Sequence, residues 1–136
     1  MTSFLLSIRT PEKLYLSVAA DVLILPGQDG ERSILANELS EVVLLKEGVL
    51  SYSKDGRKSS FYVGEGAFSF DHEKNEATVL VSFVLSPGDF RLSDLAKKES
   101  ELARSLDAEE DPARKALLQK ELLRTRTLES LSGTQG

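Results

Sequence analysis

The single histidine of this chain, His72, is the first residue to consider for chemistry, because it lies between two carboxylates, Asp71 and Glu73. A catalytic triad or a histidine-based metal site needs further partners at a suitable spacing. With one histidine and no cysteine, the chain lacks those partners. We therefore interpret His72 as a solvated residue of a polar hairpin loop rather than as a catalytic group.

Two other stretches contain residue types that occur at reaction sites. Gly64-Glu65-Gly66 lacks the spacing and the following helix of a phosphate-binding loop. Glu109 and Glu110 form a carboxylate pair, but nothing in the predicted loop around them would exclude water. The sequence therefore predicts a protein that is not an enzyme and that has no metal site and no cofactor.

The composition is ordinary for a soluble globular chain, with 40% hydrophobic and 29% charged residues among 136. The formal net charge of -5 argues against nucleic-acid binding, which depends on a basic patch. The N-terminal residues lack the basic flank of a signal peptide, and no segment approaches the roughly 18 apolar residues of a membrane span. We expect a cytoplasmic protein that reaches a membrane only through a protein partner.

Short apolar runs, separated by Gly, Asp, Asn and Pro, make up the first two-thirds of the chain. Lys54-Asp55-Gly56-Arg57 is predicted to be a tight hairpin turn, and residues 71–75 a longer hairpin loop. The predicted strands are residues 4–8, 14–19, 21–25, 41–45, 48–53, 59–63, 67–70 and 77–85. So many short strands without a helical pattern between them predict an antiparallel β-sandwich or flattened barrel.

The composition changes near Ser86-Pro87-Gly88, after which strong helix formers dominate. We predict a β-sandwich domain over residues 1–86 and a two-helix hairpin domain over residues 89–132. Its helices are expected at about 90–106 and 112–131, as antiparallel neighbours, followed by a frayed tail, SGTQG. Asp111 is the predicted cap of the second helix, with Pro112 at its first position.

Glu99 lies near the middle of the apolar face of the first helix. Two interpretations remain open for it. The side chain can bend out to solvent along the helix, or it can pair with Arg124 or Arg126 across the hairpin, since a buried unpaired carboxylate is costly.

The second helix has three apolar stripes, although a helix in a bare hairpin needs only one. The helix can pack on the sandwich as well as on the first helix. Alternatively, part of its apolar surface can serve a second partner or a second conformation. The three stripes comprise Ala113, Leu117, Leu128 and Leu131; Leu118 and Leu122; and Ala116 and Leu123.

The stretch LPGQDGERSIL, residues 25–35, contains two turn signals with an acidic residue on each side of the second. It can be an ordinary solvated turn between strands. It can also be a rigid acidic tip that offers carboxylates and backbone groups to a basic or polar partner, with little conformational entropy to lose.

A strand-rich first part followed by a charged helical hairpin resembles the epsilon subunit of the F-type (rotary) ATP synthase. The resemblance runs from about residue 3 to the end of the chain. The segments that carry it are TPEK (10–13), DVLILPGQDGE (21–31), LKEGVL (45–50) and FYVGEGAF (61–68). Each segment is weakly specific, but their order and spacing together are hard to obtain by chance.

The resemblance implies a non-catalytic rotor subunit of the central stalk, at the cytoplasmic face of the bacterial plasma membrane, that couples the gamma shaft to the ring of c subunits in proton-driven ATP synthesis. The implied contacts with the ring are Gln28, Asp29, Gly30 and Glu31. The implied contacts with gamma are Ser33, Asn37, Glu38 and Ser40. The competing hypothesis is a stand-alone interaction module, in which the sandwich presents its hairpin to an unrelated partner.

Two segments depart from the pattern of the family. SILANEL (33–39) replaces a run that usually contains Gly, Pro and His, so that contacts through that histidine are not expected. LSDLAK (92–97) has Ser93 and Ala96 where many bacterial members have the Asp and Arg of an ATP-binding motif. The hairpin is therefore not expected to sense ATP.

In the family, the helical hairpin can extend along gamma toward the catalytic alpha and beta subunits and block ATP hydrolysis. The resemblance therefore implies that basic side chains of the hairpin could contact an acidic loop of the beta subunit. The candidates are Lys97, Lys98, Arg104, Arg114, Lys115, Lys120, Arg124 and Arg126.

Overall fold

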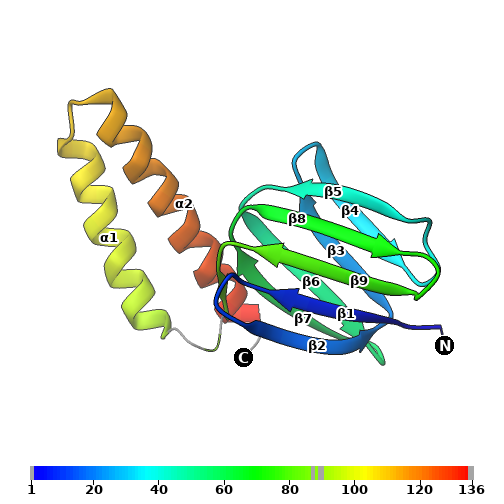
Figure 1. Ribbon diagram of the computed structural model, residues 1–136. Helices are drawn as coiled ribbons and strands as arrows, with labels where there is room; N and C mark the ends of the chain where they lie inside the picture. Colours follow the sequence, from blue (N-terminus) through cyan, green and yellow to red (C-terminus); the bar gives the residue numbers. More distant parts are fainter. Residues whose placement is uncertain (1, 87, 89–90, 135–136) are drawn as a thin grey trace. The chain divides into compact units, whose positions relative to one another are not determined.

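A computed structural model describes residues 2–86, 88 and 91–134 of the chain. It divides the chain into two compact units, Met1–Leu85 and Ser86–Gly136 (Figure 1). The first unit is built of strands and the second of two helices. The described residues include no helix that is both long and apolar enough to cross a membrane.

The first unit is a ten-stranded sandwich that closes almost into a barrel, as the sequence predicted. The hydrogen-bonded order is β10-β7-β6-β3-β5-β8-β9-β1-β2, and β4 pairs with β3. The strands are β1 (Phe4–Arg9), β2 (Leu14–Ala20), β3 (Val22–Gly27), β4 (Gly30–Leu35), β5 (Glu41–Leu45), β6 (Gly48–Lys54), β7 (Arg57–Val63), β8 (Gly66–Asp71), β9 (Glu76–Val81) and β10 (Val84–Leu85). The layer of β5, β8, β9, β1 and β2 lies in front in Figure 1.

Alternation along the strands builds the core, because successive side chains point to opposite faces of a sheet. In β1, Leu6 and Ile8 are fully buried, and in β9 Val79 occupies the equivalent inward position. Phe68 of β8 is the largest fully buried side chain of the unit. One core therefore joins the two layers.

The pairing differs from a purely antiparallel sandwich at one place. β1 runs parallel to β9, with Leu5 opposite Glu76, while its other neighbour, β2, is antiparallel. At the end of the strand order, β2 comes into contact with β6. The ring of Tyr15 in β2 also meets that of Phe61 in β7 edge-on, with centroids 5.8 Å apart.

Both predicted hairpin turns are confirmed. Lys54 pairs with Arg57, and the two residues between them, Asp55 and Gly56, have φ values of 51° and 80°. Positive φ at both central positions is the geometry that matches the twist of the flanking strands. Asp71 pairs with Glu76, which leaves residues 72–75 as the longer loop.

The strand predictions were wrong in three respects. Residues 30–35 form β4, which was not predicted, because its middle residues are polar and its only strand partner is β3. Residues 77–85, predicted as one strand, are divided at Ser82 and Phe83 between β9 and β10. β3 also continues through Pro26 to Gly27, past the residue where a turn was predicted to begin.

The second unit is the predicted antiparallel pair of helices, α1 (Leu92–Ala108) and α2 (Pro112–Thr134). Asp111 caps α2, since its Oδ1 accepts a hydrogen bond from the Ala113 N–H at 3.1 Å. Both helices end later than predicted, and the proposed tail was wrong for residues 132–134, which are helical. Residue 90, the predicted start of the first helix, and residues 135–136 lie outside the described residues.

The interface between the helices uses one face of each. Leu95 and Leu102 of α1 are buried, as are Leu122, Thr125 and Leu128 of α2. Two other leucines of α2 lie outside this interface: Leu117 and Leu123 are 65% and 66% exposed. The stripe of Ala116 and Leu123 is therefore not used by the hairpin.

Glu99 forms the predicted charge pair across the hairpin, with Arg126. Nε of Arg126 donates to Oε1 of Glu99 at 3.1 Å. Of the two interpretations of Glu99, the ion pair is confirmed.

Candidate functional site

The turn between β3 and β4 forms a short, tight tip of the sandwich. Gly27 pairs with Gly30, so that Gln28 and Asp29 alone connect the two strands. Gly30 has a φ of 129°, a conformation that residues with a Cβ rarely adopt. A Cβ on Gly27 would lie 2.6 Å from the Gly30 carbonyl oxygen. The two glycines therefore determine the shape of the tip, which we define as residues 27–31.

The tip is fastened to β5 by backbone and side-chain contacts. The N–H of Gln28 donates to the Leu44 carbonyl at 3.0 Å, and the N–H of Lys46 donates to the Pro26 carbonyl at 2.9 Å. Nη2 of Arg32 donates to Oε1 of Glu41 at 2.6 Å. This hydrogen bond, together with the negative charge of Glu41, raises the pKa of Arg32. The tip is consequently held in one geometry.

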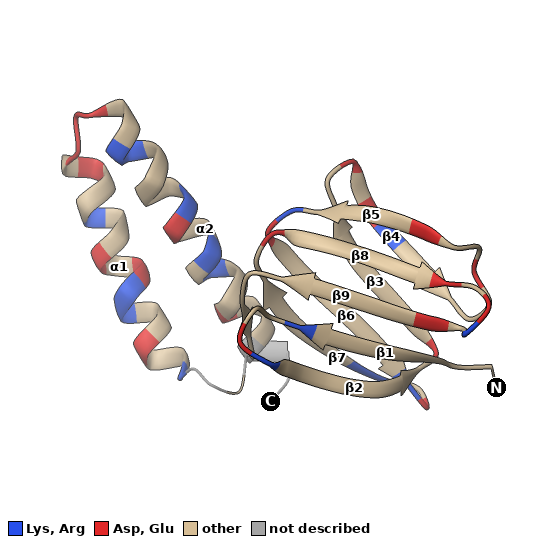
Figure 2. Ribbon diagram, viewed as in Figure 1, with Lys and Arg blue, Asp and Glu red and all other residues tan. Residues whose placement is uncertain are grey.

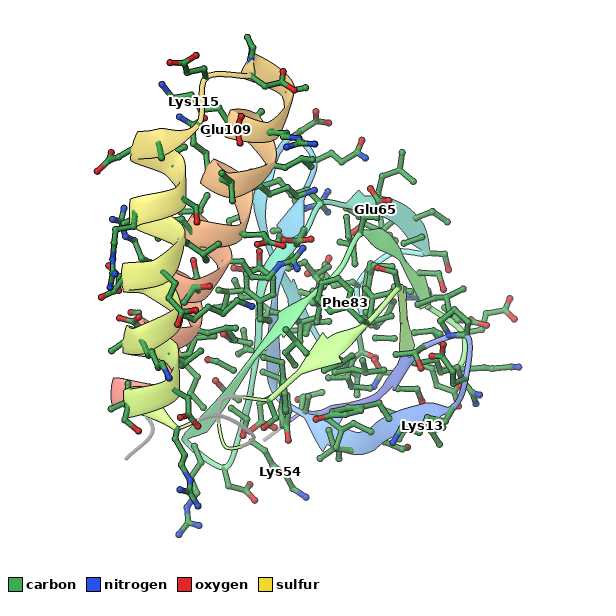
Figure 3. All side chains as sticks on the ribbon, turned by 90° about the vertical axis from the view of Figure 1, so that its left-hand side faces the viewer. Lys13, Lys54, Glu65, Phe83, Glu109 and Lys115 are labelled. Atoms are coloured by element: carbon green, nitrogen blue, oxygen red, sulfur yellow. The ribbon has the colours of Figure 1, made fainter. Side chains whose placement is uncertain are left out.

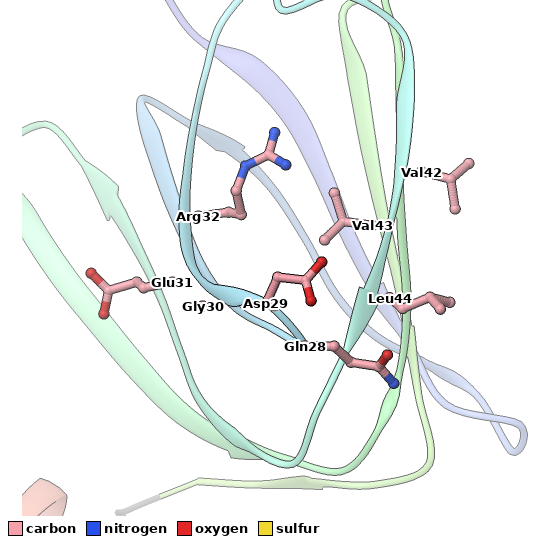
Figure 4. Close-up of a pocket in the computed structure, with 9 residues that line it drawn as sticks. Gln28, Asp29, Gly30, Glu31, Arg32, Val42, Val43 and Leu44 are labelled. Carbon is pink, nitrogen blue, oxygen red and sulfur yellow. The ribbon is translucent and has the colours of Figure 1, made fainter.

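The charge of the tip is negative. Glu41 compensates the charge of Arg32, so that Asp29 and Glu31 are the remaining charges within residues 27–32. A surface hollow of about 330 Å³ lies between the tip and β5. In Figure 4, Asp29 points toward this hollow and Glu31 points away from it. The four predicted ring-contact residues, Gln28 to Glu31, are thus brought together here.

The segment between β4 and β5, residues 36–40, lies at the opposite end of these strands. It is held by the β8–β9 loop: the Asn37 N–H donates to Oδ1 of Asn75 at 2.7 Å. The N–H of His72 donates to Oγ of Ser40 at 2.8 Å, and its Nδ1 lies 2.8 Å from the Glu38 carbonyl oxygen. Hydrogen bonds from the β8–β9 loop therefore hold the 36–40 segment in place.

His72 is exposed, as predicted, but it is more than a solvated loop residue. Its backbone and its ring both contact the 36–40 segment. The ring of His72 thus reaches this segment from a different loop.

The predicted gamma-contact residues fall into two places. Asn37, Glu38 and Ser40 gather in the 36–40 segment, whereas Ser33 lies in the middle of β4. A six-residue strand spans roughly 20 Å. The segment and the tip are therefore separate contact points at the two ends of β4.

An exposed face without charge connects these two ends. Strand register aligns Leu44 with Ala67 and Leu80, and Val42 with Ser69 and Thr78. All of them point outward, since the residues between them are inward. The charged outward residues lie at the margins of this face, at Arg9, Asp71 and Glu76. We define the outer face as Ser7, Val42, Leu44, Ala67, Ser69, Thr78 and Leu80.

The outer face is the part of the site that sequence reasoning missed. Val42, Leu44 and Leu80 are 72%, 58% and 51% exposed. Contiguous exposed apolar residues are characteristic of protein–protein contacts. The sequence contained a signal, because EVVLL and ATVLV have apolar residues in both phases of the strand, which predicts burial of both faces of the sheet.

The eight predicted basic contacts are distributed over both helices (Figure 2). Lys115 lies at the end of the hairpin that carries the joint between the helices, as does Glu109 (Figure 3). Arg126 is engaged with Glu99 within the hairpin. Arg126 therefore already has a partner inside its own unit.

In the part of the chain that the structure describes, no three His, Asp or Glu side chains are grouped to hold a metal ion. The features gathered on the sandwich are a fixed acidic tip, a fixed loop segment and an uncharged face. This arrangement suits the binding of other proteins.

Comparison with known proteins identifies the family. The β-sandwich domain of the ATP synthase delta/epsilon chain matches residues 3–98, which is more than half of the chain. This chain is a member of the ATP synthase delta/epsilon family. The match covers the described sandwich and the first turns of α1.

Several relatives carry the epsilon name. The ATP synthase epsilon chain 2 of Nitrobacter hamburgensis is 30% identical over 106 residues, which cover 78% of this delta/epsilon chain and 76% of the relative. The ATP synthase epsilon chain of Campylobacter fetus is 33% identical over 108 residues, covering 79% and 77%. The mitochondrial ATP synthase subunit delta of Schizosaccharomyces pombe is 26% identical over 121 residues, covering 88% and 70%.

Solved structures share the fold of this delta/epsilon chain. A chain of the Euglena gracilis mitochondrial ATP synthase, from a structure of OSCP, F1 and c-ring, superposes with a TM-score of 0.79 at 18% identity. The superposition covers 94% of this chain and 80% of the other. A chain of the Tetrahymena thermophila mitochondrial ATP synthase central stalk and c-ring gives 0.57 at 12% identity, covering 96% and 97%.

Proposed function

We propose that this protein is a non-catalytic subunit of the central stalk of an F-type ATP synthase, where it joins the gamma shaft to the ring of c subunits. The observation that carries the proposal is the uncharged outer face, bounded at one end by the acidic tip and at the other by the fixed 36–40 segment. Family membership supports this reading, and so do the two structural neighbours, which belong to assemblies with a c-ring.

The tip is the proposed contact with the ring. It is small, negative and fastened to β5, so that binding a polar or basic loop would order few additional side chains. Complementary charge at such a contact would favour the correct orientation of the partners. Gln28, Asp29, Gly30 and Glu31 supply this contact.

The outer face and the 36–40 segment are the proposed contact with gamma. Leu39 at the end of this surface is 77% exposed, and it extends the apolar area toward Asn37, Glu38 and Ser40. Burial of apolar surface provides most of the free energy of protein association, at about 25 cal/mol per Å². The shaft would thus be bound mainly by apolar contact and the ring by polar contact.

The helical hairpin is the proposed restraint on ATP hydrolysis. The exposed Leu117 and Leu123 of α2 lie outside its interface with α1, which suits an element that packs against a second partner. Its basic residues other than Arg126 would meet acidic groups of the catalytic subunits. No ATP-dependent change in melting temperature is expected at millimolar ATP, because Ser93 and Ala96 replace the carboxylate and guanidinium of the family motif.

The proposed location follows from these partners. The protein would be peripheral, at the cytoplasmic face of a bacterial plasma membrane, and would be attached through the ring and the shaft rather than through lipid contacts of its own.

The test of the proposal is binding to a purified complex of gamma with the catalytic subunits. We expect the wild-type chain to bind at micromolar concentration or below, and Leu44→Lys to weaken binding by about tenfold or more, because the ammonium group would be buried in an apolar contact. Lys58→Ala, at an exposed position of β7, is the matched control and should bind as the wild type does. Failure of the wild type to bind, or equal binding by Leu44→Lys, would exclude this use of the outer face.

A further inference from the structure

The interface of the helical hairpin contains a group of three charged side chains whose charges do not balance. Glu99 of α1 and Glu129 of α2 are both carboxylates, and among the described residues the guanidinium of Arg126 of α2 acts on both of them. Arg126 donates to Oε1 of Glu99 at 3.1 Å. The group therefore has one more negative charge than positive charges when both carboxyls are ionised.

Of the two carboxyl groups, that of Glu129 is the less well solvated and the less well hydrogen-bonded. It lies one turn beyond Thr125 and two beyond Leu122, on the buried face of α2. Its Oε1 is buried and, among the residues that the structure describes, has no hydrogen-bond partner. Glu99 and Arg126 are better solvated, with side chains 30% and 57% exposed. An ionised carboxylate at Glu129 is therefore poorly compensated, while a protonated one could share a hydrogen bond with Glu99.

We propose that Glu99, Arg126 and Glu129 form a proton-operated latch, which closes the helical hairpin most tightly when the two carboxyls together hold one proton. In that state the proton lies on Glu129, and Glu99 remains ionised in its ion pair with Arg126. When the proton leaves, two carboxylates face one guanidinium across the interface, and the two helices separate more readily. The latch adds a response to proton concentration that the proposed role as a stalk subunit does not itself require.

The electrostatics of the group support this order of protonation. Burial, then the hydrogen bond that a protonated Glu129 can donate to Glu99 and the negative charge of Glu99, raise the pKa of Glu129, although the charge of Arg126 acts in the other direction. The hydrogen bond that Glu99 can accept from a protonated Glu129, then the one that it accepts from Arg126, lower the pKa of Glu99, although desolvation acts against them. Glu99 and Arg126 are the charged groups whose influence on Glu129 decides its protonation.

The direction of the pH dependence follows from linkage between protonation and folding. A raised pKa at Glu129 means that the closed hairpin binds a proton more readily than the open one, so that stability increases as the pH falls through this pKa. A lowered pKa at Glu99 has the opposite effect: its stabilisation is lost as the pH falls further, below the ordinary range for Glu. The closed hairpin is therefore most stable between these two pKa values and less stable at neutral and alkaline pH.

The experiment measures hydrogen exchange of the backbone amides of α1 and α2 in the full chain, from about pH 8 down to the ordinary pKa of Glu, at about pH 4.5, corrected for the intrinsic pH dependence of exchange. Protection of the hairpin amides in the wild type should rise on acidification. A difference of one pKa unit between closed and open hairpin corresponds to about a tenfold change in the opening equilibrium. The amides of the sandwich are the internal reference and should not follow this profile.

Three variants test the assignment. Glu129→Gln removes the titrating group but keeps its shape, so that protection should be high at all pH values. Glu99→Gln should reduce the rise on acidification, because the partner that favours protonation of Glu129 is gone. Glu101→Gln, an exposed neighbour on α1, should behave as the wild type does.

Two results would overturn the proposal: wild-type protection independent of pH, or a Glu129→Gln profile that matches the wild type. A titration of the Glu side-chain carboxyl carbons in the unmodified chain provides an independent check if a variant does not fold. There, Glu129 should titrate above its ordinary range and Glu99 below it, and the reverse order would also overturn the proposal.

Discussion

Arg32 and Glu41 form an ion pair of 2.6 Å between β4 and β5, two strands that each pair with β3. The pair lies beside the tip and is partly exposed, with side chains 46% and 29% accessible. Such pairs contribute little to overall stability. Its effect is local: it holds β4 against β5 and keeps the positive charge of Arg32 compensated.

This relationship predicts the behaviour of Glu41→Gln. The melting temperature should change little, but the amides of Asp29 and Glu31 should exchange faster, because β4 loses a tether. Hydrogen exchange resolved by residue provides the measurement. Glu31→Gln is the matched control, since it removes a charge from the same region while leaving the ion pair intact. Unchanged tip exchange in Glu41→Gln would show that the backbone bonds to β5 are sufficient.

Gly66→Ala should destabilise the sandwich. A Cβ at this position would lie 1.9 Å from the Leu80 carbonyl oxygen, so that β8 and β9 would have to move apart. Overpacking of this kind costs about 1–3 kcal/mol, which thermal unfolding can measure. Ser69→Ala, at an exposed position of the same strand, should leave the unfolding midpoint nearly unchanged. Equal unfolding midpoints for Gly66→Ala and Ser69→Ala would contradict the close approach of β8 to β9 at Gly66.

The helical hairpin offers a comparison between two leucines. Leu102→Ala removes a buried side chain from the α1–α2 interface and should destabilise the hairpin by about 2–3 kcal/mol. Leu123→Ala removes a side chain that is 66% exposed and should change stability within about 0.5 kcal/mol. Helix-specific hydrogen exchange separates the hairpin from the sandwich. If Leu123→Ala alters ATPase regulation without altering stability, the unused stripe serves a partner.

Removal of the helices tests the proposed restraint on hydrolysis. A chain that ends after Pro87 should retain the folded sandwich, because its core lies within residues 4–81. It should also raise the ATPase rate of the reconstituted complex, since the hairpin can no longer engage the catalytic subunits. Circular dichroism and a steady-state ATPase assay provide the two measurements. An unchanged rate in a complex that contains the truncated chain would limit the hairpin to a structural role.

Local sequence patterns were sufficient to predict the architecture, and particular residues show why. Short apolar runs separated by turn residues predicted the strands that bury Leu6, Ile8 and Phe68. Turn chemistry predicted the Asp55-Gly56 turn, and capping predicted the start of α2 at Pro112. These are local rules, and the tertiary structure does not override them here.

The candidate site was only partly predictable, because its defining features are not local. β4 is a polar edge strand, and its existence depends on β3 rather than on its own residues. The outer face arises when register aligns Leu44, Ala67 and Leu80 from three strands. The hydrogen bond from the Asn37 N–H to Asn75 joins residues that are 38 positions apart in the sequence. No pattern within a single segment shows these relations.

The parallel pairing of β1 with β9 has a consequence for biosynthesis. β1 is made first, yet one of its edges stays unsatisfied until residues 76–81 leave the ribosome. Pairing over such sequence separations is slow, because the intervening chain must first be brought together. The nascent sandwich therefore completes its barrel only after residues 76–81 have emerged, and until then the edge of β1 that faces β9 stays unpaired.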